Sequence, residues 1–286
     1  LCDVRDFDRI NSIINESKPD FIFHLAAQPL VRLSYKDPLE TFSVNALGSA
    51  NILESLRNLE KKVNVVMITS DKAYDNVEWE WGYRESDKLG GKDPYSASKG
   101  MAELVIRSYH SSYFSSQESN VRIGVSRAGN VIGGGDWASD RIIPDCMKAW
   151  SEENIVKIRN PVATRPWQHV LEPLSGYLTQ ALALERSNEL NGEAFNFGPP
   201  SDQNHSVEDL ILEMSNHWEK VKWESVTPDS SMHEAGLLKL NCDKAIHFLN
   251  WQPTLSFEET VKFTVDWYRA YYNSPENILK ISLAQL

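Results

Sequence analysis

Short apolar runs alternate with helix-length segments along the first half of the chain. Residues 20–25 (DFIFHL), 63–69 (VNVVMIT) and 121–126 (VRIGVS) are rich in β-branched or aromatic residues, as strands buried on both faces of a sheet are. Strands separated by helices form βαβ units with right-handed crossovers. The alternation therefore predicts an α/β protein built on a doubly wound parallel sheet.

Helix-start signals lie between and beyond these runs. Asp37 is a candidate N-cap followed by Pro38, with apolar residues at helical spacing up to Leu56, and Asp93 precedes Pro94 in the same way. Ser206 and Ser256 each stand three positions before an acidic residue, which is the pattern of a capping box. These four positions are predicted to begin helices.

The alternation loosens after Gly135, where we expect a helix over 141–150 and strands over 155–158 and 194–197. The second half is interpreted as a smaller, discontinuous lobe that closes over the carboxyl edge of the sheet, where ligands bind in such folds. The expected division is a Rossmann-like domain of residues 1–135 with a return segment at about 168–198, and a ligand-binding lobe of residues 136–167 and 199–286.

Tyr95 and Lys99 lie four residues apart in KDPYSASKGMAEL, so a helix brings them to one face. A lysine cation beside a phenol favours the phenolate, which moves the pKa of the hydroxyl from ~10 towards neutral pH. Such a group can take the proton of an alcohol while hydride leaves the same carbon. The pair is a weak signal by itself, because both residues are common on exposed helix faces.

The chain has 286 residues and a net charge of −11, which disfavours non-specific binding to nucleic acid or to anionic membranes. A phosphate ligand must therefore be met by local arginines, lysines and helix N-termini. Cys2, Cys146 and Cys242 have no metal-like spacing and fit a reducing compartment. No apolar run approaches the ~20 residues of a membrane span, and no signal peptide is recognised. We expect a soluble, cytoplasmic protein without a metal.

A dinucleotide-binding fold begins with a strand and a glycine-rich turn into a helix. No such motif precedes Leu1, and Gly133-Gly134-Gly135 lies too late in the chain to replace it. We therefore expect that the first βαβ segment is missing. Asp3 and Val4 would then remain from the strand end that lies beside the adenine.

Several motifs taken together resemble a known family. The chain contains, in this order, HLAAQPLVR, TSDKAYDN, WGYRE, DPYSASKG, RAGNVIGGGDW and RPWQHVLEP. Over essentially its whole length it is similar to the extended short-chain dehydrogenases/reductases and, within them, to the CDP-D-glucose 4,6-dehydratases. The dTDP-glucose relatives carry Thr-Asp-Glu where this chain has Ser70-Asp71-Lys72. The resemblance implies an NAD-dependent lyase that acts on a nucleotide-sugar, CDP-glucose, in deoxysugar biosynthesis, including that of lipopolysaccharide O-antigen.

The same resemblance implies the roles of the catalytic residues. Tyr95, assisted by Lys99 and Ser70, takes the proton of the C4 hydroxyl while hydride passes to NAD. Asp71 protonates the C6 hydroxyl as water is lost across C5 and C6, which requires a raised pKa, and hydride then returns to C6. Lys72 is either the base for the C5 proton or a group that positions the substrate electrostatically while another group or water takes that proton.

Binding roles are implied in the same way. The expected cofactor contacts are Asp3, Val4, Leu25, Ala26 and Ala27, with Tyr95 and Lys99, and the expected substrate contacts are Gln28, Asn130, Arg141, Arg165 and Lys239. Arg165 is expected to bind the pyrophosphate bidentately, whereas Arg141 and Lys239 have a solvated surface charge as the alternative. The aromatic residues Trp79, Trp81 and Tyr83 either stack on the cytosine or line the sugar pocket, or they anchor a loop. His24 and His169 are expected to be structural.

The resemblance further implies a homodimer or a dimer of dimers, in which the helices that contain Pro38 and Tyr95 pair with their symmetry mates. Apolar residues at Met101, Leu104, Val105 and Tyr109 permit this arrangement, unless all four face the sheet. Two other functions stay open. One is another nucleotide-sugar 4,6-dehydratase or a 4-epimerase, although an epimerase has no use for an acid–base pair at 71 and 72. The other is a non-catalytic fragment without the glycine-rich turn.

Overall fold

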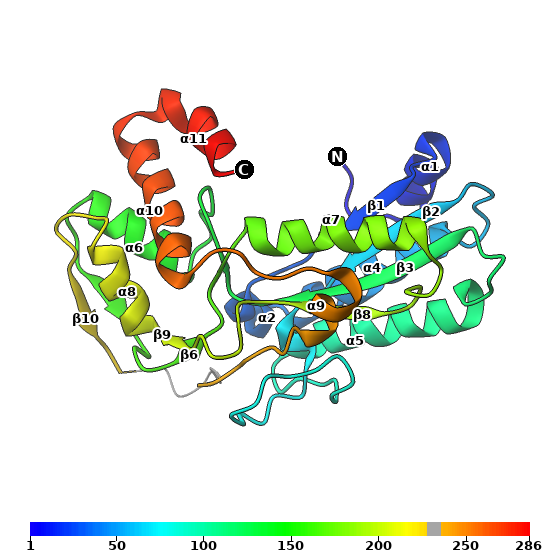
Figure 1. The fold of residues 1–286 in the computed structure, drawn as a ribbon, viewed down its shortest axis with the longest axis horizontal. Helices are drawn as coiled ribbons and strands as arrows, with labels where there is room; N and C mark the ends of the chain where they lie inside the picture. Colours follow the sequence, from blue (N-terminus) through cyan, green and yellow to red (C-terminus); the bar gives the residue numbers. More distant parts are fainter. Residues whose placement is uncertain (228–235) are drawn as a thin grey trace.

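A parallel sheet forms the centre of the molecule, which is a computed structural model that describes residues 1–227 and 236–286 (Figure 1). The strand order of this sheet is β1 (Phe21–His24), β2 (Val63–Ile68), β3 (Val121–Ala128), β8 (Ala194–Phe197). Three pairs of short strands lie outside it: β4 (Val131–Ile132) with β7 (Gln168–His169), β5 (Val156–Ile158) with β10 (Trp223–Ser225), and β6 (Thr164–Arg165) with β9 (His205–Ser206).

The α-helices are α1 (Phe7–Ser17), α2 (Val31–Lys36), α3 (Pro38–Phe42), α4 (Gly48–Ser55), α5 (Pro94–Tyr109), α6 (Ile142–Ser151), α7 (Leu171–Arg186), α8 (Val207–Ser215), α9 (Asp243–Leu249), α10 (Phe257–Asn273) and α11 (Ile278–Gln285). Two π-helical turns, η1 (Ser43–Leu47) and η3 (His110–Phe114), and two 3₁₀ turns, η2 (Asp71–Ala73) and η4 (Pro275–Asn277), complete the described elements.

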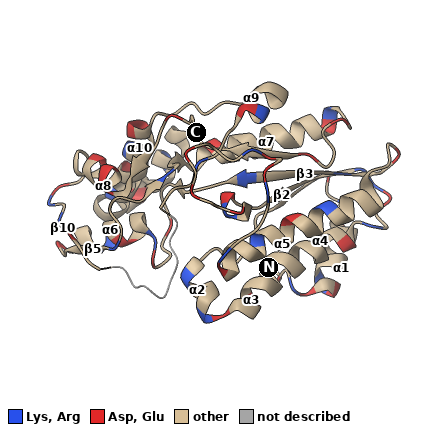
Figure 2. Ribbon diagram, turned by 90° about the horizontal axis from the view of Figure 1, so that it is seen from below, with Lys and Arg blue, Asp and Glu red and all other residues tan. Residues whose placement is uncertain are grey.

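Side-chain alternation along β2 explains how helices cover both faces of the sheet. Val65 and Met67 belong to an apolar cluster with residues of α1, α4 and α5, whereas Val66 belongs to a cluster with Tyr177 and Leu184 of α7. Successive residues of a strand point to opposite faces, so an unbroken apolar run is what a sheet covered on both sides requires. Figure 2 shows the result, with α7 and α9 on one side of β2 and β3 and α1, α4 and α5 on the other.

The predicted fold class is confirmed, and so are the strands and the helix starts on which it rests. The Asp37 carboxylate accepts a hydrogen bond from the Glu40 backbone N–H, and Asp93 caps α5 through the Ser96 N–H. Ser206 and Ser256 form the two capping boxes. The local hydrogen-bonding chemistry of a helix start depends on a few adjacent residues, which is why the sequence predicts it well.

The helix expected to run from Pro38 to Leu56 is interrupted by the π-turn η1. Asn45 in this turn donates to the Gln28 carbonyl (3.1 Å) and to Ser98 Oγ (2.8 Å) on α5, and its own Oδ1 accepts the Gln28 N–H (2.8 Å). A π-turn widens the helix by one residue, and such turns are often found near functional sites. Here the wide turn lets Asn45 join the loop after β1 to the helix that carries Tyr95.

The four apolar positions along α5 divide between two directions. Val105 and Tyr109 pack against the core, whereas Met101 and Leu104 are 44% and 55% exposed. The alternative in which all four face the sheet is therefore wrong.

The second half of the chain has a core of its own. Cys146, Met147 and Trp150 of α6 pack with residues of β5, α8 and α10. Figure 1 shows these elements gathered at one end of the sheet. None of the helices in the described ranges has the length and apolar character required to cross a membrane.

Candidate active site

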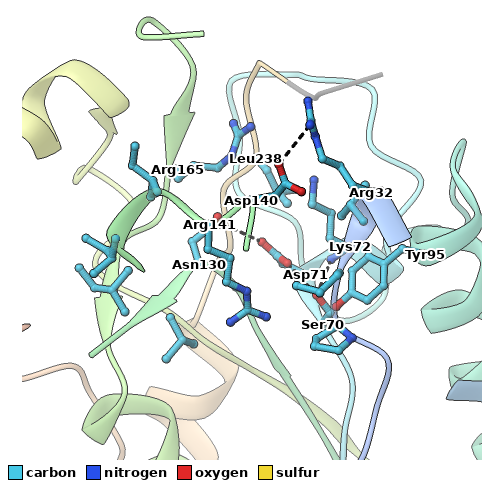
Figure 3. A pocket seen from close by; sticks show the side chains of 18 of the residues that line it. Arg32, Ser70, Asp71, Lys72, Tyr95, Asn130, Asp140, Arg141, Arg165 and Leu238 are labelled. Carbon is cyan, nitrogen blue, oxygen red and sulfur yellow. Dashed lines mark hydrogen bonds and ion pairs between the residues drawn. The ribbon is translucent and has the colours of Figure 1, made fainter. Parts of the chain in front are cut away.

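A cavity of about 870 Å³ opens where β2 and β3 end. Ser70, Asp71, Lys72, Tyr95 and Asn130 line it. Figure 3 shows the side chains of Ser70, Asp71, Lys72 and Tyr95 together on one side, with Asn130 facing Asp71 from the other. The carboxyl ends of neighbouring parallel strands meet at one edge of a sheet, which is where ligands bind in doubly wound folds. The motifs that follow β2 and β3 and the motif that opens α5 therefore contribute to one site.

Local structure fixes the orientation of the first three of these residues. Ser70 caps the 3₁₀ turn η2, since its Oγ accepts the Lys72 N–H at 3.2 Å. Only Thr69 and Ser70 separate this turn from β2, so the side chains of residues 70–72 are presented at the edge of the sheet. Tyr95 lies in the first turn of α5, and its backbone N–H donates to Ser34 Oγ at 3.1 Å.

Asp71 is a buried carboxyl held by hydrogen bonds. Ser70 Oγ donates to its Oδ1 at 2.9 Å, and Asn130 Nδ2 donates to its Oδ2 at 3.3 Å. Burial raises the pKa of Asp71, against the opposing effects of the Lys72 charge and the Ser70 hydrogen bond. The carboxyl packs so closely against Gly129 that a Cβ at this glycine would lie 1.9 Å from Oδ2. The expectation of a raised pKa at Asp71 is confirmed.

Tyr95 and Lys99 differ from expectation in their electrostatics. Burial raises the pKa of Tyr95 to about 12, against hydrogen bonding by Ser70, and burial lowers the pKa of Lys99 to about 8. The prediction that Lys99 moves the Tyr95 pKa towards neutral pH is wrong for the protein alone. The reason is that desolvation penalises the charged form of each group, so both the phenolate and the ammonium are disfavoured.

A buried ion pair lies behind these groups. Glu103 and Arg127 have side chains only 4% and 2% exposed, and Arg127 Nε and NH2 donate to the two carboxylate oxygens at 2.8 and 2.9 Å. Thr69, the residue before Ser70, donates its hydroxyl to Glu103 Oε1 at 2.6 Å. One carboxylate therefore joins α5 to the ends of both β2 and β3. This pair was not predicted from the sequence.

Positively charged side chains line both sides of the cavity. Asp140 pairs with Arg32 and with Arg159, and Asp136 pairs with Arg141 at 2.9 Å. The lysines and arginines that line the whole cavity are Arg32, Lys36, Lys72, Lys92, Arg141, Lys157, Arg159 and Arg165. They outnumber the lining aspartates Asp71, Asp93, Asp136, Asp140 and Asp145, although the chain as a whole is acidic. The cavity is suited to an anionic ligand.

Arg32, Arg159 and Asn160 line the cavity without having been predicted. Arg32 stands in HLAAQPLVR, a few residues beyond β1. A cation so close to the carboxyl end of a strand could have indicated a ligand contact, because ligands bind at that edge of the sheet. Arg159 and Asn160 directly follow the short strand β5. The position of β5 beside the cavity depends on how the second half of the chain packs against the sheet, which its local sequence does not indicate.

Among the residues predicted to bind the cofactor or the substrate, Leu25, Arg141 and Arg165 line the cavity together with Ser70, Asp71, Lys72, Tyr95 and Asn130. Other residues predicted to bind a ligand do not line it. Gln28 is buried away from it, where its amide donates to Thr41 Oγ1 (2.7 Å) and its Oε1 accepts the Leu30 N–H (2.6 Å). Lys239 is half-buried outside the lining, in which its neighbour Leu238 takes part. The sugar contact of Gln28 stays a prediction, although Thr41 and Leu30 already use part of its hydrogen-bonding capacity.

The remaining predicted cofactor residues also lie outside the cavity lining. Asp3 is exposed and pairs with Arg5, whose hydrogen bond lowers the Asp3 pKa to about 2. Val4 packs against Gly48. Ala26 is exposed and Ala27 half-buried just after β1, and Lys99 is buried behind Tyr95.

The loop aromatic residues and the two histidines are structural here. Tyr83 stacks on Tyr74 with ring centroids 5.1 Å apart, and Trp79 packs on Tyr83 at 5.3 Å. Together they anchor the loop, and no member of the group Trp79, Trp81 and Tyr83 is among the residues that line the cavity. His24 and His169 are buried, which lowers the pKa of each to about 4. No His, Cys, Asp or Glu cluster suited to a metal ion occurs within residues 1–227 and 236–286.

Comparisons with known proteins agree with this geometry. A family model described as GDP-mannose 4,6-dehydratase matches residues 1–264. The chain is 44% identical to the CDP-glucose 4,6-dehydratase of Salmonella typhimurium over 281 residues, which is 97% of this chain and 78% of that protein. It is 23% identical to the human dTDP-D-glucose 4,6-dehydratase over 284 residues, covering 97% and 77% of the two chains.

Among solved structures, that of a double mutant of the dTDP-glucose 4,6-dehydratase DesIV from Streptomyces venezuelae has a TM-score of 0.78. The two sequences are 22% identical, and the match covers 98% of this chain and 81% of that one. This likeness shows the fold.

Proposed function

Since the chain belongs to the GDP-mannose 4,6-dehydratase family, we propose that it is a hydro-lyase that converts CDP-D-glucose to CDP-4-dehydro-6-deoxy-D-glucose with NAD as its cofactor. The observation that carries this proposal is the group formed by Ser70, Asp71, Lys72 and Tyr95 at one end of a cavity whose other wall is rich in arginine. The first set of residues suits proton transfer, and the second suits a diphosphate.

Asp71 distinguishes a dehydratase from an epimerase. Its pKa is raised by burial, so the carboxyl can keep a proton and donate it to a departing hydroxyl. A 4-epimerase removes no hydroxyl and gains nothing from a protonated acid beside the sugar. The Asn130 and Ser70 hydrogen bonds hold this acid in a fixed position.

The proton of the C4 hydroxyl is assigned to Tyr95. Its phenol is buried beside Ser70. Tyr95 accepts the proton only in its deprotonated form, which the positive charge of an oxidised nicotinamide ring would favour against the effect of burial. Lys72 lines the same side of the cavity and is assigned either to the C5 proton or to electrostatic positioning of the substrate. Bound NAD supplies the chemistry that side chains lack, by accepting hydride from C4 and returning it to C6.

The residues around the end of β1 and on α5 fit a nicotinamide cofactor. Lys99 is buried, and in the described part of the chain its amine has no hydrogen-bond or ion-pair partner, although it lies one turn from Tyr95. Leu25 is 51% exposed at the carboxyl end of β1, and the small side chain of Ala26 follows it. Lys99 would bind ribose hydroxyls, and Leu25 and Ala26 would leave room for the dinucleotide. We assign cofactor binding mainly to residues 1–135 and about 168–198, and sugar-nucleotide binding mainly to the rest.

The preference for cytidine rests on the gap between 44% and 23% identity to the CDP- and dTDP-glucose dehydratases. The cytoplasm is the proposed compartment, because Cys2, Cys146 and Cys242 are all free thiols. Deoxysugar synthesis for lipopolysaccharide O-antigen is the proposed biological context.

The proposed assembly is a homodimer formed through α5 and its neighbours. Met101 and Leu104 of α5, Leu39 of α3 and Leu47 of η1 are exposed apolar residues. They stand on elements that contact one another, and exposed apolar surface gathered in this way favours association. Leu104→Glu should convert the dimer to a monomer in light scattering. Leu212→Glu, at a leucine on α8 that is also more than half exposed, is the control and should leave the dimer intact. A wild-type monomer at micromolar concentration would contradict the proposal.

Two variants test the reaction because its half-reactions use different groups. Tyr95→Phe should leave bound NAD unreduced after CDP-glucose is added. Asp71→Asn combined with Lys72→Ala should still oxidise C4 but stall before water is lost, so that the absorbance of reduced cofactor accumulates in a single turnover. General acid–base groups contribute about 10²–10⁴-fold, which makes the stalled species visible. Tyr109→Phe, on the same helix but bonded to Glu54, is the control.

CDP-, dTDP-, GDP- and UDP-glucose should be compared as substrates of the same enzyme. Preference for a nucleotide other than cytidine would overturn the assignment of the base. Release of dehydrated product by the double variant at the wild-type rate would overturn the roles of Asp71 and Lys72.

A further inference from the structure

A single carboxylate connects two arginines from distant parts of the chain at the cavity. Asp140 Oδ1 lies 3.1 Å from Arg32 NH1 and 3.6 Å from Arg159 NH1, and all three residues line the cavity. Arg32 belongs to α2, near the end of β1, whereas Asp140 and Arg159 belong to the segments on either side of α6 and β5. Figure 3 shows the Arg32–Asp140 contact on the far side of Lys72 from Ser70.

Arg32 is not fully satisfied by this contact. Its Nε is buried and has no hydrogen-bond partner within residues 1–227 and 236–286. A buried donor without a partner is unfavourable, and the penalty is removed when an acceptor arrives. A guanidinium bonded through NH1 alone can still donate to further oxygens, in the bidentate manner typical of its contacts with phosphate groups.

Asp140 is the carboxylate in direct contact with both arginines, but a second one is close. Asp145 on α6 also interacts with Arg159 and Arg32, and its pKa is raised chiefly by burial and also by the charge of Asp140. Asp140 itself is largely exposed and has a left-handed backbone with φ of 62°, which Asp and Asn tolerate better than most residues.

We propose that Arg32 and Arg159 form a clamp for the diphosphate of the nucleotide-sugar, and that Asp140 occupies this clamp until the substrate displaces it. The identity of the ligand rests on the proposed function. The clamp acts in addition to Arg165, which lines the same cavity.

The exchange of Asp140 for a diphosphate is favourable on simple grounds. Ion pairs between partly exposed groups contribute little to stability, so Asp140 is released at small cost. A diphosphate offers two charges and several acceptor oxygens, enough to engage both guanidinium groups and the free Arg32 Nε. Until then the carboxylate holds the two arginines close together, which reduces the ordering that binding requires.

The direct test is the Asp140→Asn variant, measured by calorimetry with CDP as the probe. Asn keeps the size of Asp and tolerates the left-handed backbone, so the substitution removes mainly the competing charge. CDP should bind about threefold to tenfold more tightly, as expected when two weak ion pairs no longer compete, and the gain should shrink at high salt. Asp266→Asn is the control, because it removes one charge from a paired aspartate on α10, outside the cavity lining.

The arginines are tested in the same assay. Arg32→Gln and Arg159→Gln should each weaken CDP binding about tenfold and leave cytidine binding unchanged, since cytidine lacks the diphosphate. Thermal unfolding of each variant shows whether its fold is intact. NAD is the second probe, because its diphosphate has the same chemistry.

Three results would overturn the clamp. CDP binding to Asp140→Asn that is unchanged or weaker would make Asp140 a structural bridge. An equally large gain in CDP affinity for Asp266→Asn would show that the gain comes from the change in net charge. Loss of NAD binding without loss of CDP binding in the arginine variants would assign the clamp to the cofactor. Wild-type turnover of CDP-glucose is measured separately, so failure of the proposed function is distinguishable from failure of the clamp.

Discussion

Gly129→Ala should impair the loss of water while leaving the oxidation of C4 largely intact. The added Cβ would lie 1.9 Å from Asp71 Oδ2 and 2.3 Å from its Cγ, whereas real Cβ contacts do not fall below 3.0 Å. The carboxyl must therefore move by about 1 Å, the scale of misplacement that can reduce a rate about 10²-fold. Such a movement also breaks the 3.3 Å hydrogen bond from Asn130.

The readout is the absorbance of reduced cofactor in a single turnover with CDP-glucose. Tyr95 stands on a different element from Gly129, so C4 oxidation should proceed and reduced cofactor should build up. Overpacking should also reduce the free energy of unfolding by about 1–3 kcal/mol. Gly124→Ala is the matched control, because it overpacks β3, the strand that ends just before Gly129. Its Cβ would lie 2.3 Å from Gln180 Nε2, so it should cost stability without stalling the reaction. Dehydration by Gly129→Ala at the wild-type rate would refute the reasoning that Asp71 is the fixed acid.

Three further predictions concern stability. Glu103→Gln leaves the buried Arg127 guanidinium without its counter-charge and should lower the free energy of unfolding by about 3–5 kcal/mol in urea titrations; a loss below about 1 kcal/mol would contradict the importance of the pair. Burial holds the pKa of His24 and of His169 at about 4 in the folded state, against 6.5 as the ordinary value, so the folded protein binds fewer protons than the unfolded chain. The stability that the two neutral histidines contribute is present above pH 6.5 and is lost as the pH falls towards 4. The loss in unfolding free energy should be about 3 kcal/mol for each histidine. An unfolding free energy that is independent of pH between 6.5 and 4 would be the contrary result. Ser256→Ala removes the N-cap of α10 and should cost about 1 kcal/mol, which thermal unfolding can check.

The parts of the fold that the sequence predicted depend on neighbouring residues. The Asp37-Pro38 and Ser256–Glu259 helix starts need only a few consecutive side chains, and the apolar run of β2 needs only its own composition. Each is decided by local hydrogen bonding or by burial of a short segment.

The features that the sequence did not predict depend on residues brought together from far apart. Arg32 and Asp140 are 108 positions apart, and no pattern along the chain pairs them. The hydrogen bonds of Gln28 with Thr41 and Leu30 were not predicted either. The Tyr95 pKa was predicted in the wrong direction, because the spacing to Lys99 gives their proximity but not the depth of burial that dominates the shift.

The two walls of the cavity come from different stretches of the chain, and this has a consequence for how the protein can diversify. Residues 70–72 and 95 are the proposed proton-transfer groups, whereas Arg141, Arg159 and Arg165 stand within a span of 25 residues on the facing wall. Mutations in that span can alter which nucleotide is held without disturbing the acid and base that act on the sugar. Exchanging residues 139–165 with those of a relative is therefore a compact way to transfer nucleotide preference between members of the family, while the reaction itself is inherited unchanged.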